Sequence, residues 1–328
     1  MRRVPVCIAG LALVAGLGLS ACGSDDKADT AKDTTTSAPS DDGSTTTAGA
    51  TPVGMQELNV TAHDFSFEGL PKEIKGGTTQ ITFTNEGSVA HDLAFVQVEK
   101  GTSLDQFVKD FTPALQGGPW PAYAKAVVGP VMANAGASTV SEFTIEPGTY
   151  AVMCGQTGDP AKPKGPDGSP GDGDAHLMRG MAQLVTVTDG GSDEPLPEPD
   201  GTLTAKDYSF DVDVSGGDKV IRFTNEGPAE VHFADIQAFP AGTTEDQANA
   251  AVETLFSLPE GQAPPAGTPM PTETGFSGIL SPGPEINFTM AEPFESGRVY
   301  VAMCFISDRA GGPPHAIGQH MIKVFTAA

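Results

Sequence analysis

The sequence predicts an all-β protein made of two tandem Greek-key β-sandwich domains, and two observations lead to this prediction. First, the two halves of the chain repeat one another: ITFTNEG at 81–87 returns as IRFTNEG at 221–227, each time after a Gly-Gly pair. Second, short apolar or alternating segments are separated by turn-forming residues, with 40 Gly and 28 Pro in the chain. Such punctuation is typical of antiparallel sandwiches and not of βαβ units.

The repeat also indicates where the domains begin and end. LNVTAHDFSF at 58–67 matches TLTAKDYSF at 202–210, and YAVMC at 150–154 matches YVAMC at 300–304. We therefore expect a first domain at 55–189 and a second at 200–328. The Pro- and acid-rich segment 190–199 is the expected linker between them.

One short helix is expected within each domain, after the repeated FTNEG segment. Leu104, Phe107, Val108 and Phe111 recur at helical spacing in the first half, and Ala248, Ala251, Val252, Leu255 and Phe256 do so in the second. Ser103 with Gln106, and Thr244 with Gln247, match the capping-box pattern of a helix start. The apolar stripes are predicted to pack on the core.

The N-terminal segment has the layout of a secretory signal. Met1-Arg2-Arg3 is basic, residues 4–21 are apolar and small, and the run closes on Leu-Ser-Ala-Cys22. This ending resembles the lipobox of bacterial lipoproteins, which implies removal of residues 1–21 and attachment of lipid to Cys22. A transmembrane helix is the alternative, because about 18 apolar residues can just span a bilayer. Residues 22–54, rich in Ser, Thr and Asp, are expected to be a disordered tether.

Composition excludes some partners. The formal charge is -24, from 18 basic and 42 acidic residues. A chain this acidic is not expected to bind nucleic acid, and an anionic membrane surface would repel it. Membrane attachment is therefore expected through the lipid anchor alone, and a protein partner is expected to be basic.

The cysteines leave two interpretations open before any motif is considered. Of the four in the chain, Cys7 would leave with the signal and Cys22 would carry lipid. Cys154 and Cys304 then remain in a compartment that favours disulfides. They could form one bridge, or they could be two inert buried thiols.

The histidines suggest a third role for these cysteines. In each half one histidine follows the Asn-Glu-Gly turn and another follows the cysteine, and Met181 and His320 each come five positions later. This pattern resembles the cupredoxins, the blue-copper proteins of the plastocyanin and azurin type. The resemblance implies a cupredoxin-like fold with one copper in each domain. Its ligands would be His91, Cys154, His176 and Met181 in the first domain, and His232, Cys304, His315 and His320 in the second.

Two departures from the pattern carry expectations of their own. The segment 155–175 between Cys154 and His176 is far longer than the ligand loop of plastocyanin-type proteins. In the second domain His320 takes the axial place of Met181, and strand alternation predicts that Met321 points to the opposite face. An axial imidazole would favour Cu(II) and lower the potential of that site.

These observations lead to a functional hypothesis and an alternative. The hypothesis is a membrane-tethered, extracytoplasmic copper protein that transfers single electrons or holds copper, since two imidazoles and a thiolate suit both oxidation states. The chain has no H-x-H, H-C-H, G-x-S-x-G, P-loop or H-E-x-x-H motif, so no enzymatic activity is expected. The alternative is a metal-free cupredoxin-like scaffold that presents acidic loops to a protein partner.

Overall fold

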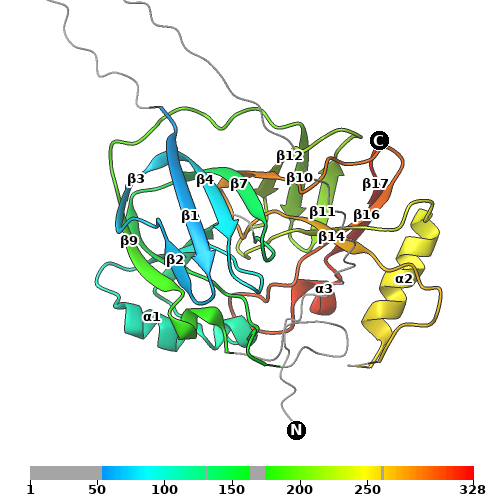
Figure 1. Cartoon of the computed structure of the whole chain (residues 1–328), viewed down its shortest axis with the longest axis horizontal. Coiled ribbons are helices and arrows are strands. Elements are labelled where there is room, and N and C mark those ends of the chain that lie inside the picture. Colours follow the sequence, from blue (N-terminus) through cyan, green and yellow to red (C-terminus); the bar gives the residue numbers. More distant parts are fainter. Residues whose placement is uncertain (1–53, 130–131, 163–173, 260–261) are drawn as a thin grey trace, which may run out of the picture. The chain divides into compact units, whose positions relative to one another are not determined.

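A computed structural model describes residues 54–328 apart from 130–131, 163–173 and 260–261. The predicted signal peptide (1–21), the lipid site Cys22 and all but the last residue of the predicted tether (22–54) lie outside the described residues. The described part is built mainly of β-strands, as predicted (Figure 1). No helix within it is both long and apolar enough to span a membrane.

The first half is a sandwich of two sheets. One sheet contains, in order, β2 (Ser66–Glu68), β1 (Gln56–His63), β4 (Gly77–Asn85) and β7 (Ser138–Ile145). The facing sheet contains β3 (Glu73–Lys75), β9 (Ala182–Thr188), β8 (Gly148–Met153), β5 (Ala94–Val98) and β6 (Ala124–Val128). Strand β1 pairs in parallel with β4, whereas β4 and β7 are antiparallel.

The second half repeats this arrangement. Its first sheet contains β11 (Ser209–Asp213), β10 (Gly201–Lys206), β12 (Val220–Asn225) and β15 (Glu285–Thr289). Its second contains β14 (Thr272–Phe276), β13 (Asp235–Ala238), β16 (Val299–Met303) and β17 (Ile322–Thr326). Strand β10 pairs in parallel with β12, as β1 does with β4. The predicted domain bounds stay a prediction, but the strands of each half fall within them.

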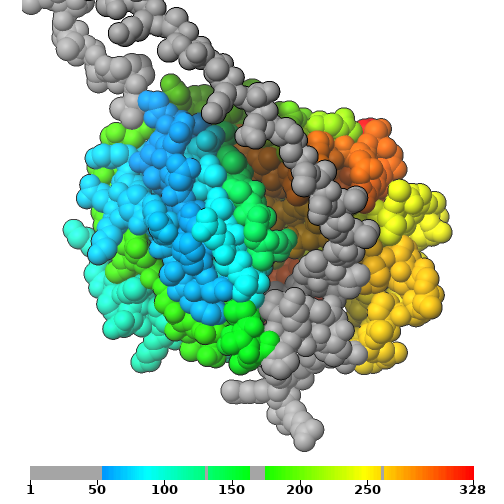
Figure 2. Space-filling model, viewed as in Figure 1, coloured from blue at the N-terminus to red at the C-terminus, as the bar shows by residue number. Residues whose placement is uncertain are grey.

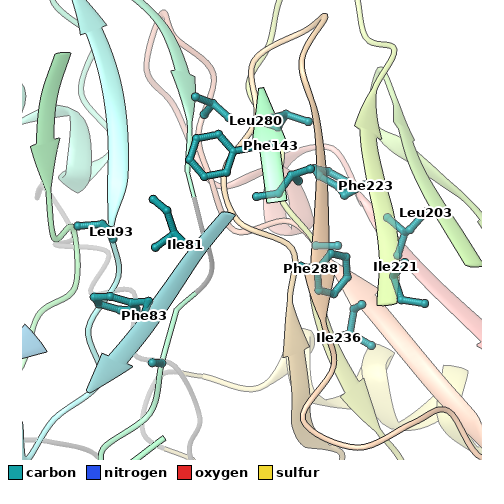
Figure 3. Packing of buried hydrophobic residues seen from close by; sticks show 14 of the residues in the cluster. Ile81, Phe83, Leu93, Phe143, Leu203, Ile221, Phe223, Ile236, Leu280 and Phe288 are labelled. Atoms are coloured by element: carbon teal, nitrogen blue, oxygen red, sulfur yellow. The ribbon is translucent and has the colours of Figure 1, made fainter. Parts of the chain in front are cut away.

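Alternating burial explains why the repeated ITFTN and IRFTN segments form strands. In β4, Ile81 and Phe83 are fully buried, and in β12 Ile221 and Phe223 are as well, while the residues between them are partly exposed. This two-residue period directs one face of each strand into a sandwich core. Figure 3 shows these four side chains among the buried residues of both halves.

The two halves are joined by more than their linker. Strand β15 pairs antiparallel with β7, with Ile286 opposite Phe143, so the first sheets of both halves form one eight-stranded sheet. The linker is bonded to both sides: Thr78 N–H donates to the carbonyl of Ser192, and Asn287 Nδ2 donates to that of Pro197. The sequence did not predict this continuous sheet.

Both predicted helices form. α1 (Leu104–Phe111) begins at Ser103, whose side chain accepts from Gln106 N–H, and α2 (Glu245–Ser257) begins at Thr244 with a complete capping box. Their apolar faces are buried, and the yellow residues of α2 form part of the surface in the space-filling view (Figure 2). Three short helical turns were not predicted: η1 (Ala114–Gln116), η2 (His176–Arg179) and α3 (His315–Gly318).

Candidate metal centres

The Asn-Glu-Gly turn after β4 positions the first histidine. The side chain of Asn85 donates to the carbonyls of Val89 and Ala133, each at 2.8 Å, and accepts from Gly87 N–H at 2.8 Å. This turn folds the chain back so that His91 is fully buried. A Cβ on Gly87 would lie 2.8 Å from His91 Nε2, so the imidazole needs a glycine there.

The second half builds the same turn. Asn225 Nδ2 donates to the carbonyls of Glu230 and Leu280, each at 2.9 Å, and Gly227 N–H donates to Asn225 Oδ1 at 3.0 Å. His232 is fully buried beside this turn. The repeated motif therefore places one histidine per half at the same point in the fold.

The cysteine and the second histidine come together at the end of a core strand. Cys154 follows β8, and its carbonyl accepts from Leu177 N–H at 3.0 Å, which places η2 and His176 beside it. In the second half the carbonyl of Cys304 accepts from Ala316 N–H at 2.7 Å and holds α3 in the same way. Each short helical turn thus brings its histidine to the cysteine.

In the first centre three potential ligand atoms face one another. Cys154 Sγ lies 3.7 Å from His91 Nδ1 and 3.4 Å from His176 Nδ1, and the two Nδ1 atoms are 3.0 Å apart. Ligand atoms about 2.0–2.3 Å from one metal ion must lie roughly 3–4 Å from each other. These spacings therefore match ligands of a single ion.

The second centre has almost the same geometry. Cys304 Sγ lies 3.8 Å from His232 Nδ1 and 3.6 Å from His315 Nδ1, and the two Nδ1 atoms are 3.1 Å apart. All six ligand residues of the two centres are fully buried. Within the described ranges these are the two groups of three or more His, Cys, Asp or Glu residues that could hold a metal ion.

The outer nitrogens of His176 and His315 determine that the inner nitrogens of these two residues are free to bind. His176 Nε2 lies 3.0 Å from the carbonyl oxygen of Gly158, which can only accept, so Nε2 carries the hydrogen and Nδ1 is a bare lone pair. His315 Nε2 likewise donates to Asp308 Oδ1 at 3.0 Å. Such partners fix the tautomer and orientation of a metal-binding imidazole.

Burial sets the protonation states of the ligands without a metal. It lowers the pKa of His91 and of His232 to about 4, with the neighbouring histidine as the next cause. It raises the pKa of Cys304 to about 12 and that of Cys154 well above its usual value, where the Asp92 carboxylate adds to the effect. Near neutral pH the imidazoles are therefore neutral and the thiols keep their protons until a cation displaces them.

Both alternatives for the cysteines can now be judged. Cys154 and Cys304 are free and buried, each beside two histidines of its own half, so they do not form a bridge. They are not isolated thiols in an apolar core either, because the imidazole Nδ1 atoms converge on each sulfur. A soft thiolate with two imidazoles is a donor set suited to copper.

The structure corrects the prediction of which residue is in the axial position of the second centre. Met181 is fully buried, its N–H donates to the carbonyl of His176 at 3.1 Å, and its carbonyl accepts from Cys154 N–H at 3.0 Å. Met321 makes the same two bonds, to His315 at 3.1 Å and from Cys304 at 3.3 Å, and is also fully buried. Met321, and not His320, is the counterpart of Met181.

His320 instead lies at the surface. It is exposed and has a φ of 55°, and the residue before Met181 is Gly180, which also has a positive φ of 114°. The turn after His315 is thus one residue longer than the turn after His176. Strand β17 begins only at Ile322, so the alternation that was expected to turn Met321 away does not apply. The prediction of His320 as a ligand is wrong.

Three carboxylates near the ligands were missed. Asp64 Oδ1 lies 3.5 Å from His91 Nε2, and the repeat matches Asp64 with Asp207. Asp92, directly after His91, donates its N–H to Cys154 Sγ at 3.3 Å, and its buried carboxylate accepts from Gly155 N–H at 2.8 Å. Asp308 accepts from His315. Asp92 and Asp308 have no acidic counterpart at the matching position of the other half, so the repeat gave no signal for these two. Adjacency to His91 was the only hint for Asp92.

Comparison with known proteins finds likeness among solved structures. No protein-family model and no curated protein matches the chain. An auracyanin from the photosynthetic bacterium Roseiflexus castenholzii is 23% identical over 41% of this chain and 99% of its own, with a TM-score of 0.26. A multicopper oxidase is 15% identical over 84% of this chain and 89% of its own, with a TM-score of 0.23. A copper-containing nitrite reductase from Thermus scotoductus is 14% identical over 84% of this chain and 62% of its own, with a TM-score of 0.22.

The fold and the two centres define the class of protein. The chain contains two β-sandwich halves, and each carries a buried His-Cys-His group whose donor atoms fit one copper ion. The donor set and the ligand spacing both meet what such an ion requires.

The comparisons correct the expectation that the chain is not an enzyme. The similar structures include multicopper oxidases, a laccase from Botrytis aclada and the nitrite reductase, all of which are enzymes. One fold can carry both catalytic and non-catalytic functions, so the missing H-x-H and H-C-H motifs did not justify that expectation.

Proposed function

We propose that this chain is an extracytoplasmic copper protein that transfers single electrons and is held at the membrane by lipid on Cys22. The observation that carries the proposal is the pair of buried groups in which two imidazole Nδ1 atoms and one cysteine sulfur face one another. Bound copper supplies a one-electron couple. Imidazole and thiolate ligands serve both of its oxidation states.

The protein's own contribution is a dry and rigid site. Cys154 and His176 are tied by main-chain bonds to the end of β8, and His91 is fixed by the Asn85 turn on the other sheet. Buried ligands held this firmly move little when the charge of a bound ion changes. The buried methionines Met181 and Met321 are the proposed weak axial ligands, one per centre.

The sequence supports the proposed cellular setting. The lipobox-like Leu-Ser-Ala-Cys22 supports attachment outside the cytoplasm, and the segment 22–54 would let the folded part reach a partner. With a formal charge of -24, the chain would attract a basic redox partner and would react with it more slowly as ionic strength rises.

Visible absorption and EPR spectra of the full chain in detergent, titrated with Cu(II), test the proposal. We expect an intense thiolate-to-copper band that reverses on addition of a one-electron reductant. Cys154→Ser and Cys304→Ser should each remove part of the band. A colourless protein that binds no Cu(II) would rule out the copper function and leave the metal-free scaffold. A band that cannot be reduced and reoxidised would indicate copper holding.

A further inference from the structure

The main chain of His232 is hydrogen-bonded to Leu280, and the residue after Leu280 is hydrogen-bonded to the first domain. His232 N–H donates to the carbonyl of Leu280 at 3.0 Å, and Leu280 N–H donates back at 2.9 Å. The next residue, Ser281, donates its N–H to the carbonyl of Val127 in β6 at 2.8 Å, and its side-chain Oγ accepts from Val127 N–H at 2.9 Å. Ser281 is almost fully buried, so these bonds between the domains are shielded from water.

The other histidine of the second centre is held by the loop 305–314. Asp308 Oδ1 accepts from His315 Nε2 at 3.0 Å and from the hydroxyl of Tyr208 at 2.9 Å. The next residue, Arg309, donates its N–H to Glu230 Oε2 at 2.7 Å. The Tyr208 hydroxyl therefore holds the side chain of Asp308, and Glu230 holds the main chain of the next residue, Arg309.

Arg309 fastens this loop to the first domain. Its carbonyl accepts from Trp120 N–H at 2.9 Å, and its guanidinium carbon lies 4.9 Å from the centre of the Trp120 ring. The guanidinium also donates to the carbonyl of Lys125 at 2.8 Å and to that of Ala124. An arginine can make all these contacts at once because its fork is planar and always charged.

Two glycines let the loop approach closely. Gly312 N–H donates to the carbonyl of Gly117 in the first domain at 2.9 Å. Gly311 has a φ of 85°, and a Cβ there would lie 2.9 Å from that same carbonyl oxygen. Any side chain at this position would push the loop away from the first domain.

The first centre is held mainly by its own domain. His176 Nε2 donates to Gly158, and the nearby Asp159–Arg179 ion pair, at 2.9 Å, is also local. The main chain of His91 pairs with Ala133 of the same domain. Next to it, Asn134 donates to Glu273 of the second domain, but this bond lies at the surface, where water competes with it.

We propose that metal binding at the second centre and docking of the two domains are thermodynamically linked, with Arg309 as the positioning residue, while the first centre binds independently. The proposal rests on the metal sites of the proposed function. Linkage is reciprocal: if docking strengthens binding at the second centre, a metal there strengthens docking by the same factor. Coupling of this kind typically changes affinity by about 5–150-fold.

The test uses Co²⁺ as the probe, because its thiolate band reports binding and it does not need to change oxidation state. Cys154→Ser in the full chain leaves only the second centre, and Cys304→Ser leaves only the first. Arg309→Ala should weaken Co²⁺ binding about 5–150-fold in the first background and leave it nearly unchanged in the second. Arg309→Lys, which keeps the charge but not the fork, should recover only part of the loss.

Arg298→Ala is the matched control. Arg298 donates to the carbonyl of Phe239 at 3.0 Å and lies over the Tyr300 ring, all within the second domain. It should leave Co²⁺ binding at the second centre nearly unchanged. If Arg309→Ala weakened Co²⁺ binding equally at both centres, the effect would be a general destabilisation of the fold. If it weakened Co²⁺ binding at neither centre, domain docking would not affect the second centre. Either result overturns the proposal.

Hydrogen exchange of the metal-free chain is a second test of the proposal. It does not depend on Arg309→Ala, so it can be used if that variant folds poorly. Ser281→Ala removes one buried bond between the domains, and we expect faster exchange in 305–314 but not in 155–162. Unchanged exchange in 305–314 would count against the linkage. If Co²⁺ shows the linkage but bound copper cannot be reduced and reoxidised, only electron transfer fails. If no metal binds either centre, both proposals fail.

Discussion

Asp308 Oδ1 accepts the Nε2 hydrogen of His315 at 3.0 Å, whereas the matching hydrogen of His176 meets the neutral carbonyl oxygen of Gly158. A carboxylate partner makes an imidazole a stronger electron donor than a carbonyl does. A more basic ligand favours the more highly charged state of a metal ion. The outer nitrogens of His176 and His315 are thus in different electrostatic surroundings, and the nearest carboxylate to an outer nitrogen of the first centre is Asp64, 3.5 Å from His91 Nε2.

Asp308→Asn tests what this carboxylate contributes. The amide oxygen can still accept from His315, but the negative charge is gone. We expect binding of copper at the second centre to weaken roughly 10–100-fold and its reduction potential to rise, with the first centre unchanged. Redox titration followed by EPR would measure both potentials.

Asp211→Asn is the control for Asp308→Asn, because Asp211 is an exposed acid of the same domain, paired with Lys206. It should shift neither potential appreciably. A similar shift from both variants would assign the effect to overall charge and contradict a specific role for Asp308.

Metal binding should release about one proton per centre near neutral pH. Burial raises the pKa of Cys304 to about 12, so its thiol carries a proton, while the lowered pKa of His232, about 4, leaves that imidazole neutral. The metal ion therefore displaces the thiol proton and no histidine proton. An indicator dye in weakly buffered solution would count the protons during a Co²⁺ titration.

Cys304→Ser should reduce the total released by the two centres by one proton. Release of two or more protons per centre would show that the histidines are protonated before binding, contrary to their lowered pKa values.

The repeat made much of the fold and most of the ligands predictable. Asn85 and Asn225 end matching strands and fold matching turns, so a local motif was enough to place His91 and His232. The capping-box sequence patterns at Ser103 and Thr244 located both longer helices, because helix starts are encoded within a few residues.

What escaped prediction depends on loop length or on distant contacts. The prediction of His320 assumed that the turn after His315 is as long as the turn after His176. The turn after His315 has one extra residue, so Met321 and not His320 takes the place that matches Met181. Arg309 carries no local pattern that could reveal its bonds to Ala124 and Lys125, because those depend on how the two sandwiches pack. The pairing of β15 with β7 was hidden for the same reason.

The axial position can be tested with two variants of neighbouring residues. Met321→Leu keeps the size and apolar character of a buried side chain but removes the sulfur, so the copper spectrum and potential of the second centre should change. His320→Ala, at an exposed site, should change neither. Both are measured by absorption and EPR in the Cys154→Ser background. A spectral change with His320→Ala and none with Met321→Leu would restore His320 as the ligand.

Asp235 should make the metal-free protein less stable as pH rises. Burial, with Glu273 as the next cause, raises its pKa to about 8, and Oδ1 has no hydrogen-bond partner among the described residues. In an unfolded chain the pKa of an aspartate is about 3.9. The folded state thus holds a proton that the unfolded state has lost, and its stabilising effect disappears as pH rises from about 4 to about 8.

Asp235→Asn cannot titrate, so it should be more stable than the parent chain at pH 8, with a smaller difference at pH 5. Urea unfolding of metal-free protein at both pH values would measure this, with the exposed Asp213→Asn as control. The amide can still accept from Gln237 Nε2, as Asp235 Oδ2 does at 2.8 Å, so the local bond is kept. If the difference between Asp235→Asn and the parent did not grow with pH, Asp235 would be ionised throughout and its carboxylate would have a partner that offsets burial.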